Sequence, residues 1–447
     1  MKFKTYLLCS AFSLFLFTCN AQWTETGTGV NALNADGFIH ELHVTTNGTL
    51  LTAGQFRNAG NYCYVAAFNG TNWQELGTGA NALNTNGTIY SLASDSSGNV
   101  YAAGTFQDSL GSYYVAKWNG NYWSPVGATP FNGYIKKIKT DKAGKLYAVG
   151  SFTNISGNHY VAMWDGTAWA ELGAGSNALN ANGGGEDIAI DNAGNIYTAG
   201  FFTNGSNKYY VAKWNGVSWS ETGTLNANNY IRVLETDNSG NVYAAGNFYN
   251  GAGKSFVAKW DGTGWSELGN LDANDAIFAI TIDNNQHLYV AGSFTGSNGS
   301  YVARWDGNNW SELGAASPLA PNDNILALAA GTNHRIFCAG YFTNTSNKQY
   351  VAQHTLLPND IAAVNTTGTY SVYPNPVKDQ LQVSSTAAVN GTGIKLQVYD
   401  CTGREILHLP LSGQHQITCA HWQPGAYLVK LISADNILLK THRIIKL

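Results

Sequence analysis

The chain has 447 residues and a net charge of −4, and charged residues make up only 12% of it. Glycine is abundant (50 residues) and aromatic residues reach 13%, which excludes a disordered chain, because disorder requires few aromatics and many charges. No basic stripe is present, so neither nucleic acid nor an anionic membrane surface is expected as a partner. The length suits one repeat array with an appended domain.

Residues 1–21 have the pattern of a signal peptide. Lys2 and Lys4 precede an apolar stretch over 7–17, and the small-residue site before Gln22 suits cleavage. A lipoprotein acylated at Cys19 is the alternative, although Thr18 fits poorly before it. No later segment approaches the roughly 18 apolar residues of a membrane span. We therefore expect an exported, soluble protein without a transmembrane segment.

A Trp-x-x-x-Gly segment recurs along the next three hundred residues. It begins at Trp23, Trp73, Trp123, Trp169, Trp219, Trp265 and Trp310, in steps of 50, 50, 46, 50, 46 and 45 residues. A period of this length indicates a repeat architecture.

Each repeat contains four strand-like segments and no helical period. In the second repeat they are 73–77, 89–93, 100–106 and 113–118, and the next repeat begins at Trp123. The turn Asn119-Gly120, with Asp-Gly in other copies, predicts a tight hairpin in which both central residues have positive φ. A four-stranded antiparallel sheet cannot bury both of its faces alone, and radial stacking of such sheets gives a β-propeller.

The repeats are offset at the two ends of the array. The segment 350–354 is followed by no Asp-Gly turn and no Trp, whereas 23–27 is an outer strand with nothing before it. We infer that the N-terminus completes the last sheet and closes the ring, because closure pairs strand edges that would otherwise be exposed. The prediction is an all-β fold, with a seven-bladed β-propeller over 22–354 closed by the N-terminal strand.

The repeat motif V-A-x-W-[DN]-G-x-x-W-x-x-[LT]-G resembles a bacterial repeat family of predicted propellers, related to kelch-like and cortical-marker-type arrays. The resemblance covers 23–354, and the third copy departs from the motif with Pro125 in place of Glu. It implies a fold and says little about activity.

A linker is expected over 355–369, and a small C-terminal β-sandwich over 370–447. The second segment carries a spaced set of motif residues: Tyr373, Pro374, Asn375, Pro376, Gly403, Gly425 and Tyr427. These marks resemble the C-terminal sorting domain of the type IX secretion system. The resemblance implies that this secretion machinery is a partner, and that the product is released or displayed on the outer surface of a Gram-negative bacterium. The alternative is an ordinary terminal β-domain.

Four cysteines follow the predicted cleavage site. Cys401 and Cys419 share the C-terminal segment and could form a disulfide in an oxidising compartment. Cys63 and Cys338 are expected to be small buried residues.

No catalytic motif is present, so we expect no catalytic residue, no metal and no cofactor. His40 and His43 are three positions apart on a strand, which predicts opposite faces and argues against a metal pair. The recurrent Asp of the inner turn, as in Asp95, is expected to cap that turn. The repeated Glu after each Trp and the paired tryptophans such as Trp118 and Trp123 are expected to be structural, with sugar stacking as the alternative for the tryptophans.

A ligand site is expected where the repeat is broken. The variable positions after the first residue of each inner strand lie near the axis, where all blades meet. We predict a pocket at this axial mouth lined by His40, Glu41, Tyr90, Lys136, Lys137, Glu186, Asp187, Arg232 and Phe278. The alternative is that these side chains are solvated or paired between blades.

Three functions are compatible with these sequence features. The first is a secreted or surface-displayed binding or adhesion module for a glycan or a protein, and the neutral Asn-rich loops favour a polyol. The second is a secreted glycan-active lyase or hydrolase, which requires clustered titratable groups with shifted pKa at the mouth. The third is a structural scaffold without a ligand.

Overall fold

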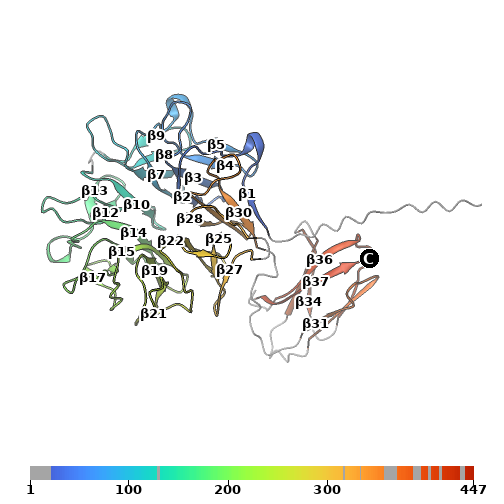
Figure 1. Ribbon diagram of the computed structural model, residues 1–447. Coiled ribbons are helices and arrows are strands. Elements are labelled where there is room, and N and C mark those ends of the chain that lie inside the picture. The colour runs from blue at the N-terminus through green and yellow to red at the C-terminus, as the bar shows by residue number, and fades with distance from the viewer. Residues whose placement is uncertain are drawn as a thin grey trace, which may run out of the picture.

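The computed structural model describes residues 22–127, 131–315, 318–332, 334–356, 370–385, 394–400, 404–411, 415–432 and 438–447. These residues form an all-β protein (Figure 1). They contain no α-helix, and the only helical elements among them are three one-turn 3-10 helices, η1 (Gly29–Asn31), η2 (Gly79–Asn81) and η3 (Gly175–Asn177). The predicted signal peptide and most of the predicted linker lie outside the described residues.

Seven four-stranded antiparallel sheets succeed one another from Trp23 to Thr355. The inner strands are β2 (Ile39–Val44), β6 (Ile89–Ser94), β10 (Ile135–Thr140), β14 (Gly185–Ile190), β18 (Ile231–Thr236), β22 (Ile277–Ile282) and β28 (Ile325–Ala330). The second strands are β3 (Leu50–Gly54), β7 (Val100–Gly104), β11 (Leu146–Gly150), β15 (Ile196–Gly200), β19 (Val242–Gly246), β23 (Leu288–Gly292) and β29 (Arg335–Gly340).

The third strands are β4 (Ala66–Phe68), β8 (Ala116–Trp118), β12 (Ala162–Trp164), β16 (Ala212–Trp214), β20 (Ala258–Trp260), β26 (Ala303–Trp305) and β30 (Ala352–Thr355). The outer strands are β5 (Trp73–Glu75), β9 (Trp123–Pro125), β13 (Trp169–Glu171), β17 (Trp219–Glu221), β21 (Trp265–Glu267), β27 (Trp310–Glu312) and β1 (Trp23–Glu25). A two-stranded ribbon, β24 (Thr295–Gly296) with β25 (Gly299–Ser300), decorates the sixth sheet.

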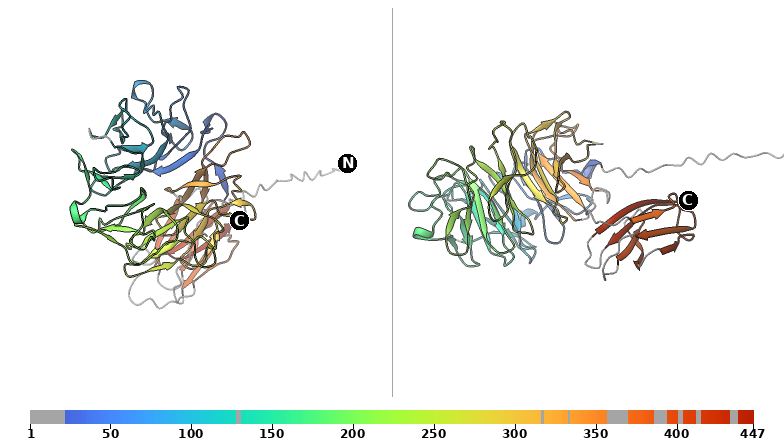
Figure 2. Two further views of the ribbon diagram at one scale, coloured as in Figure 1. Left: turned by 60° about the vertical axis from the view of Figure 1, so that its left-hand side comes forward. Right: turned by 90° about the horizontal axis from the view of Figure 1, so that it is seen from below.

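The sheets are arranged radially, with the inner strands nearest the centre (Figures 1 and 2). Sequence composition explains this stacking. The second strands are fully buried and rich in Ala and Gly, so neighbouring sheets approach closely there. The Phe that follows each second strand, as in Phe106 and Phe152, is fully buried and fills the wider space farther out.

The N-terminal strand belongs to the last sheet. β1 pairs with β30, with Trp23 opposite His354 and Glu25 opposite Ala352. The inner strand of that sheet, β28, contacts both β22 and β2. The pairing therefore makes the N-terminal strand the outer strand of the last sheet. That the array closes into a ring stays a prediction.

The repeated tryptophans of the outer strands link each sheet to its neighbour. All seven indole N–H groups donate to a backbone carbonyl of the preceding outer-strand segment, at 2.5 to 3.1 Å. The series includes Trp73 to Thr26, which joins the first sheet to the seventh, and Trp23 to Leu313, which joins the seventh to the sixth. These bonds explain why each repeat keeps a Trp at this position.

The recurrent carboxylates are structural, as expected. Asn154 Nδ2 donates to the Glu171 carboxylate at 3.1 and 3.2 Å, and the same Asn–Glu pair recurs in four other sheets. In the second sheet Asp108 stands at the Asn position and Pro125 at the Glu position, so the pair is replaced as a unit. Asp95 accepts bonds from the Ser97 and Asn99 backbone, which makes it the predicted turn cap.

The structure differs from the prediction at the hairpin turns. Only the Gly of each Asn-Gly or Asp-Gly turn has positive φ, for example Gly120 at 96° and Gly166 at 105°. The preceding Asn or Asp instead caps the turn with its side chain, as Asp165 does for the Thr167 and Ala168 backbone N–H groups at 2.8 and 2.9 Å. These hydrogen bonds lower the pKa of Asp165 to about 2.

The third strands are shorter than predicted. In the second sheet the strand begins at Ala116 instead of Tyr113, which forms isolated bridges with Gln107 and Phe131. At the end of the array, β30 runs to Thr355 and Leu356 is buried, so the last sheet extends slightly beyond residue 354.

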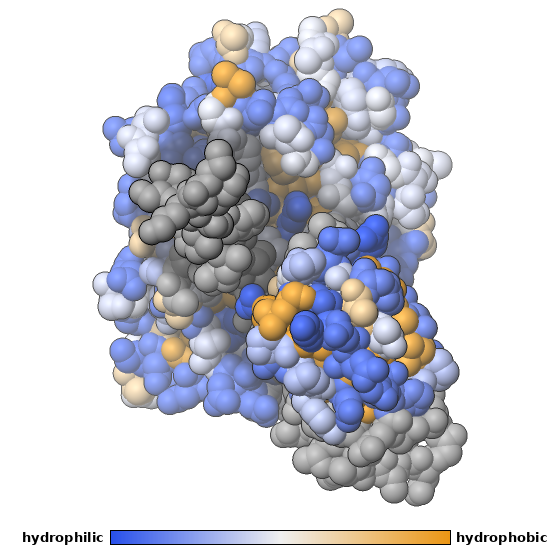
Figure 3. Space-filling view, turned by 90° about the vertical axis from the view of Figure 1, so that its right-hand side faces the viewer, coloured by the Kyte–Doolittle hydropathy of each residue, from blue (hydrophilic) through white to orange (hydrophobic). Residues whose placement is uncertain are grey.

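The C-terminal residues form two sheets around one core. The first sheet contains β31 (Tyr370–Tyr373), β32 (Gln380–Ser385) and β35 (His415–Thr418). The second contains β34 (Glu405–Leu411), β33 (Ile394–Tyr399), β36 (Gly425–Ile432) and β37 (Leu438–Lys446). Buried side chains of both sheets, such as Leu381 and Val429, form a single hydrophobic cluster. Hydrophilic residues predominate on the face of the molecule in Figure 3.

The sorting-motif residues lie at the edge of this core. Asn375 bridges to β37 by donating to the Arg443 carbonyl at 2.9 Å and accepting from the Ile445 N–H at 2.8 Å. Tyr427 is buried and donates to the Gln423 carbonyl at 2.7 Å. Gly403 lies outside the described residues.

Three described cysteines, Cys63, Cys338 and Cys419, are free and buried. Cys63 and Cys338 are therefore small buried residues, as expected. Cys419 is unpaired in this structure, in contrast to the disulfide considered with Cys401, which lies outside the described residues.

Candidate functional site

A β-bulge in each inner strand builds the centre of the array. In all seven sheets the pairing with the second strand shifts after the first inner-strand residue. In β2, for example, Ile39 pairs with Gly54 and Glu41 with Ala53, so His40 is the extra residue. A bulge breaks the alternation of side chains and re-aims the residues at its position. Two consecutive variable side chains per strand can therefore face the axis.

All nine side chains predicted at the axial mouth line one cavity of about 260 Å³. It lies between the inner strands, and each of the bulges contributes to it. The structure thus brings together His40, Glu41, Tyr90, Lys136, Lys137, Glu186, Asp187, Arg232 and Phe278. That these residues bind a ligand stays a prediction.

The residues at the bulge position form a ring at the outer level of the cavity. This mouth ring has one member per sheet: His40, Tyr90, Lys136, Glu186, Arg232, Phe278 and Leu326. Lys136 Nζ lies 4.7 Å from the centre of the Tyr90 ring and 3.6 Å from the Glu186 carboxylate. The Arg232 guanidinium stacks on Phe278 at 4.3 Å and donates to the Tyr230 hydroxyl at 3.4 Å.

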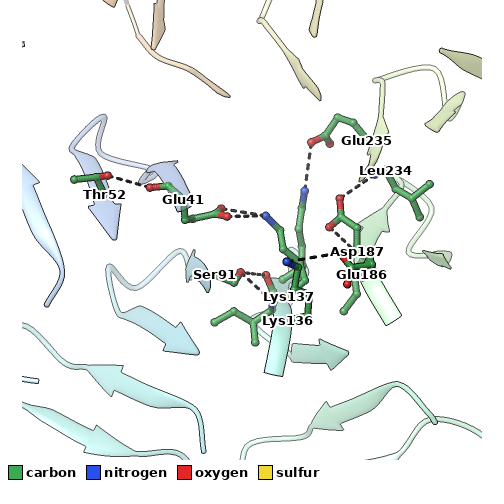
Figure 4. Close-up of polar contacts among 12 residues, drawn as sticks. Glu41, Thr52, Ser91, Lys136, Lys137, Glu186, Asp187, Leu234 and Glu235 are labelled. Atoms are coloured by element: carbon green, nitrogen blue, oxygen red, sulfur yellow. Dashed lines mark hydrogen bonds and ion pairs between the residues drawn. The ribbon is translucent and has the colours of Figure 1, made fainter. Parts of the chain in front are cut away.

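The next position of each strand forms a second ring whose polar members bond to the protein (Figure 4). Lys137 donates to both carboxylate oxygens of Glu41 at 3.0 and 3.1 Å. Asp187 is buried and accepts the Leu234 and Ile188 backbone N–H groups, each at 2.8 Å. The Glu41–Lys137 pair therefore links the first sheet to the third, and Asp187 links the fourth sheet to the fifth. These contacts agree with the alternative that mouth charges are paired between blades.

Burial governs the titration of these groups. It raises the pKa of Asp187 despite the nearby Lys137, and it raises the pKa of Glu186 despite the opposing charge of Lys136. Burial also raises the pKa of Glu41, an effect that Lys137 opposes. For Lys137 the attraction of the carboxylates outweighs burial, so its pKa rises. The two-oxygen contact with Lys137 therefore opposes the effect of burial on Glu41.

His40 is neutral in this setting. Burial, together with the charges of Lys136 and Arg232, lowers the pKa of His40 to about 4. Its Nε2 is buried and has no hydrogen-bond partner among the described residues. An unpaired buried nitrogen costs free energy, and a ligand hydroxyl could satisfy it.

His40 and His43 lie on the same side of β2, so the prediction of opposite faces is wrong. Both contact β6: the His40 ring lies 5.2 Å from the Tyr90 ring, and His43 Nε2 lies 2.8 Å from Ser94 Oγ. The bulge at His40 adds one residue to the strand, and this places both side chains on the same side. The described residues nevertheless contain no group of three or more His, Cys, Asp or Glu side chains placed to share a metal.

The cavity has an apolar wall that sequence reasoning missed. Besides Phe278, it is formed by Ala279, Ile280, Leu326, Ala327 and Leu328, all from the sixth and seventh sheets. Tyr341 also lines the cavity, and it stacks with Phe38 at 4.2 Å. Tyr341 follows the Gly that ends β29, where other repeats carry Gln, Thr, Ser, Phe or Asn. That variation was the available signal for this residue.

Two family models match parts of the chain. Residues 371–446 match the secretion system C-terminal sorting domain, and residues 3–140 match the Rax2 C-terminal beta propeller domain. The protein carries a type IX sorting domain. It is therefore secreted or displayed at the cell surface, and it interacts with the type IX machinery. None of the described residues forms a helix long and apolar enough to cross a bilayer.

Comparison with solved structures gives distant similarity. No curated protein sequence matches the chain. PorZ, described as a surface component of the type IX secretion system of Porphyromonas gingivalis, is 16% identical with a TM-score of 0.48. The match covers 93% of this chain and 59% of PorZ, so the chain spans less than two thirds of that protein.

Two enzymes have similar scores. A fungal alcohol oxidase is 10% identical with a TM-score of 0.49, and the match covers 95% of this chain and 98% of the oxidase. An ulvan lyase is 12% identical with a TM-score of 0.43, and the match covers 74% of this chain and 94% of the lyase. Similarity at this level assigns no activity to the present chain.

Proposed function

We propose that the protein is an exported binding module whose seven sheets form a closed seven-bladed β-propeller over 22–354, with the ligand in the axial cavity. The sorting domain over 370–447 carries it out of the cell, and the ligand is a glycan or a protein. The observation that carries the proposal is the mouth ring: seven bulges direct seven different side chains into one cavity, whereas the outer-strand Trp and the Phe after the second strand recur in all seven repeats. The indole bonds that run from sheet to sheet support closure.

Several features of the cavity favour a glycan over a protein. Its volume of about 260 Å³ is near the lower end of the roughly 300–1,000 Å³ typical of small-molecule pockets, so it suits one or two ring-sized groups. The cavity combines the apolar wall with the neutral imidazole of His40 and the hydroxyls of Tyr90 and Tyr341. This combination suits the apolar faces and the hydroxyls of a sugar.

The test is binding of the full chain to a glycan array, with and without a blocked cavity. Leu326→Trp places a large ring in the mouth ring beside Phe278, and Leu110→Trp is the matched control, because Leu110 is 88% exposed and lies outside the cavity. We expect wild type and Leu110→Trp to bind the same glycans and Leu326→Trp to lose at least tenfold in affinity. Absence of glycan binding by wild type would contradict a glycan ligand, and equal binding by Leu326→Trp would contradict the axial cavity as the site.

A glycan-active enzyme is the second candidate. It is favoured by the neutral His40, whose Nε2 has no partner in the described part of the chain, beside Tyr90 and within a ring that holds Glu186. Such clusters of shifted titratable groups are frequent at catalytic sites. Incubation of the full chain with a polysaccharide panel, followed by measurement of new chain ends, separates the candidates. Release that His40→Ala abolishes supports the enzyme, and no release with intact binding supports the binding module.

A further inference from the structure

Arg232 differs from every other charged residue of the cavity. Lys136 and Glu186 lie 3.6 Å apart, Glu41 and Lys137 form a close ion pair, and Asp187 accepts two backbone bonds. Within the described part of the chain, no carboxylate lies within ion-pair distance of Arg232. Its only polar contact there is the 3.4 Å bond to the neutral Tyr230 hydroxyl. The guanidinium therefore enters the mouth with most of its donors free.

Packing holds this guanidinium in place. It stacks on Phe278 at 4.3 Å, and Phe278 belongs to the apolar wall of the cavity. Tyr230 stacks in turn on Phe201 at 4.5 Å between ring centres. A planar guanidinium fixed in this way is prepared for a planar anion, because its paired N–H groups match the two oxygens of a carboxylate. Three cations and three carboxyl groups line the cavity, and Arg232 is the cation that has no ion pair among the described residues.

The remaining polar groups at the mouth are neutral. Among the described residues, the hydroxyls of Tyr90 and Tyr341 make no hydrogen bond, and His40 Nε2 has no partner. A ligand that satisfies these groups carries several hydroxyls, and only one of its groups is anionic. The apolar wall of the cavity gives the ring of such a sugar-like ligand a face against which to pack.

We propose that the axial cavity binds an acidic sugar, whose single anionic group is held by Arg232 and whose ring packs between Phe278 and Tyr341. This inference rests on the proposed function and adds the chemical class of the ligand. The anionic group can be the carboxylate of a uronate or a sulfate ester, which share the oxygens that a guanidinium recognises. A peptide with a free C-terminal carboxylate is a different ligand, and the paired charges and free hydroxyls of the cavity disfavour it.

The test compares one sugar with and without its charge. Full-length protein is titrated calorimetrically with an oligogalacturonate, the methyl ester of the same oligosaccharide, a sulfated galactan oligosaccharide and its desulfated form. We expect an acidic form to bind about ten- to hundredfold more tightly than its neutral counterpart, the range of a charge-assisted hydrogen bond. Arg232→Gln should reduce this preference to less than about threefold, and Arg232→Lys should restore part of it.

Lys259→Gln is the matched control, because it removes the same charge from the same sheet at a residue that stacks over Tyr243, away from the cavity. It should keep the full preference. Thermal unfolding of each variant checks folding, and little change is expected because Arg232 makes a single long hydrogen bond.

The outcomes distinguish this inference from the proposed function. Equal binding of charged and neutral sugars overturns the acidic ligand and leaves glycan binding in place. A preference that persists in Arg232→Gln overturns the assignment to that residue. A C-terminal tetrapeptide that binds more tightly than every sugar, in an Arg232-dependent manner, overturns the sugar. If no glycan of any class binds the wild type, the proposed glycan function fails together with the inference.

Discussion

At the scale of single residues, His43 makes the stability of the fold depend on pH. Burial and the charges of Lys137 and Lys139 lower the pKa of His43 to about 4, well below the 6.5 of an unfolded histidine. The unfolded chain therefore takes up a proton between pH 6.5 and 4, whereas the folded protein does not. The contribution of His43 to stability is complete above pH 6.5 and is lost as the pH falls toward 4, by about 1.4 kcal/mol per pH unit.

The measurement is urea unfolding of wild type and His43→Gln at several pH values. Burial also raises the pKa of Glu41 and of Asp187, and the effect of these two carboxyl groups on stability has the opposite sign. Because these groups occur in both proteins, the difference between the two unfolding free energies isolates His43. We expect wild type to lose stability relative to the variant as the pH falls, and a constant difference would refute the buried neutral histidine.

The outer-strand tryptophans give a second prediction at this scale. Trp169→Phe keeps most of the ring but removes the indole N–H that donates to the Val126 carbonyl at 2.9 Å. We expect a loss of about 1–3 kcal/mol, because the partly buried carbonyl is left without a donor. Trp164→Phe in the same sheet is the control, since Phe68 holds that position in the first sheet. Equal losses in denaturant unfolding would show that packing alone explains both residues.

At the scale of elements, the second sheet replaces a hydrogen-bonded pair. Asp108 and Pro125 stand where other sheets join an Asn amide to a Glu carboxylate, as in Asn250 and Glu267 at 3.0 Å. Pro125→Glu alone places a carboxylate near Asp108, whereas Pro125→Glu with Asp108→Asn recreates the pair. Unfolding free energies of the four proteins should give a favourable coupling of about 0.3–1 kcal/mol. Additive effects would mean that the two replacements are unrelated.

The inner strands mark the limit of prediction from sequence at this scale. Period and turn residues are enough to predict the sheets, and the variable positions are enough to predict nine residues that line one cavity. The bulges could not be predicted, because a bulge depends on pairing between strands and leaves no fixed mark in a six-residue segment. Because the bulge at His40 was not predicted, the prediction that His40 and His43 lie on opposite faces was wrong. Tyr341 was missed because it lies just after a second strand, although it shares the mouth.

At the scale of the whole molecule, the main question is whether the array is a ring or an open stack. In a ring, β1 is a structural strand of the last sheet, and Trp23 is one of seven equivalent links. In an open stack, the first few residues would be a frayed end that contributes little to stability. The two arrangements predict different losses of stability when Trp23 is replaced, so one substitution can distinguish them.

Trp23→Ala is that substitution. Trp23 is 7% exposed, packs against His354 and donates to the Leu313 carbonyl at 3.1 Å. In a closed ring its loss should cost about 3–5 kcal/mol, as for other buried aromatics, and at least as much as Trp219→Ala in the middle of the array. Denaturant unfolding of the two variants beside wild type makes the comparison. If Trp23→Ala is nearly neutral while Trp219→Ala is costly, the ring is open, because only a terminus that closes nothing can lose such a residue without loss of stability.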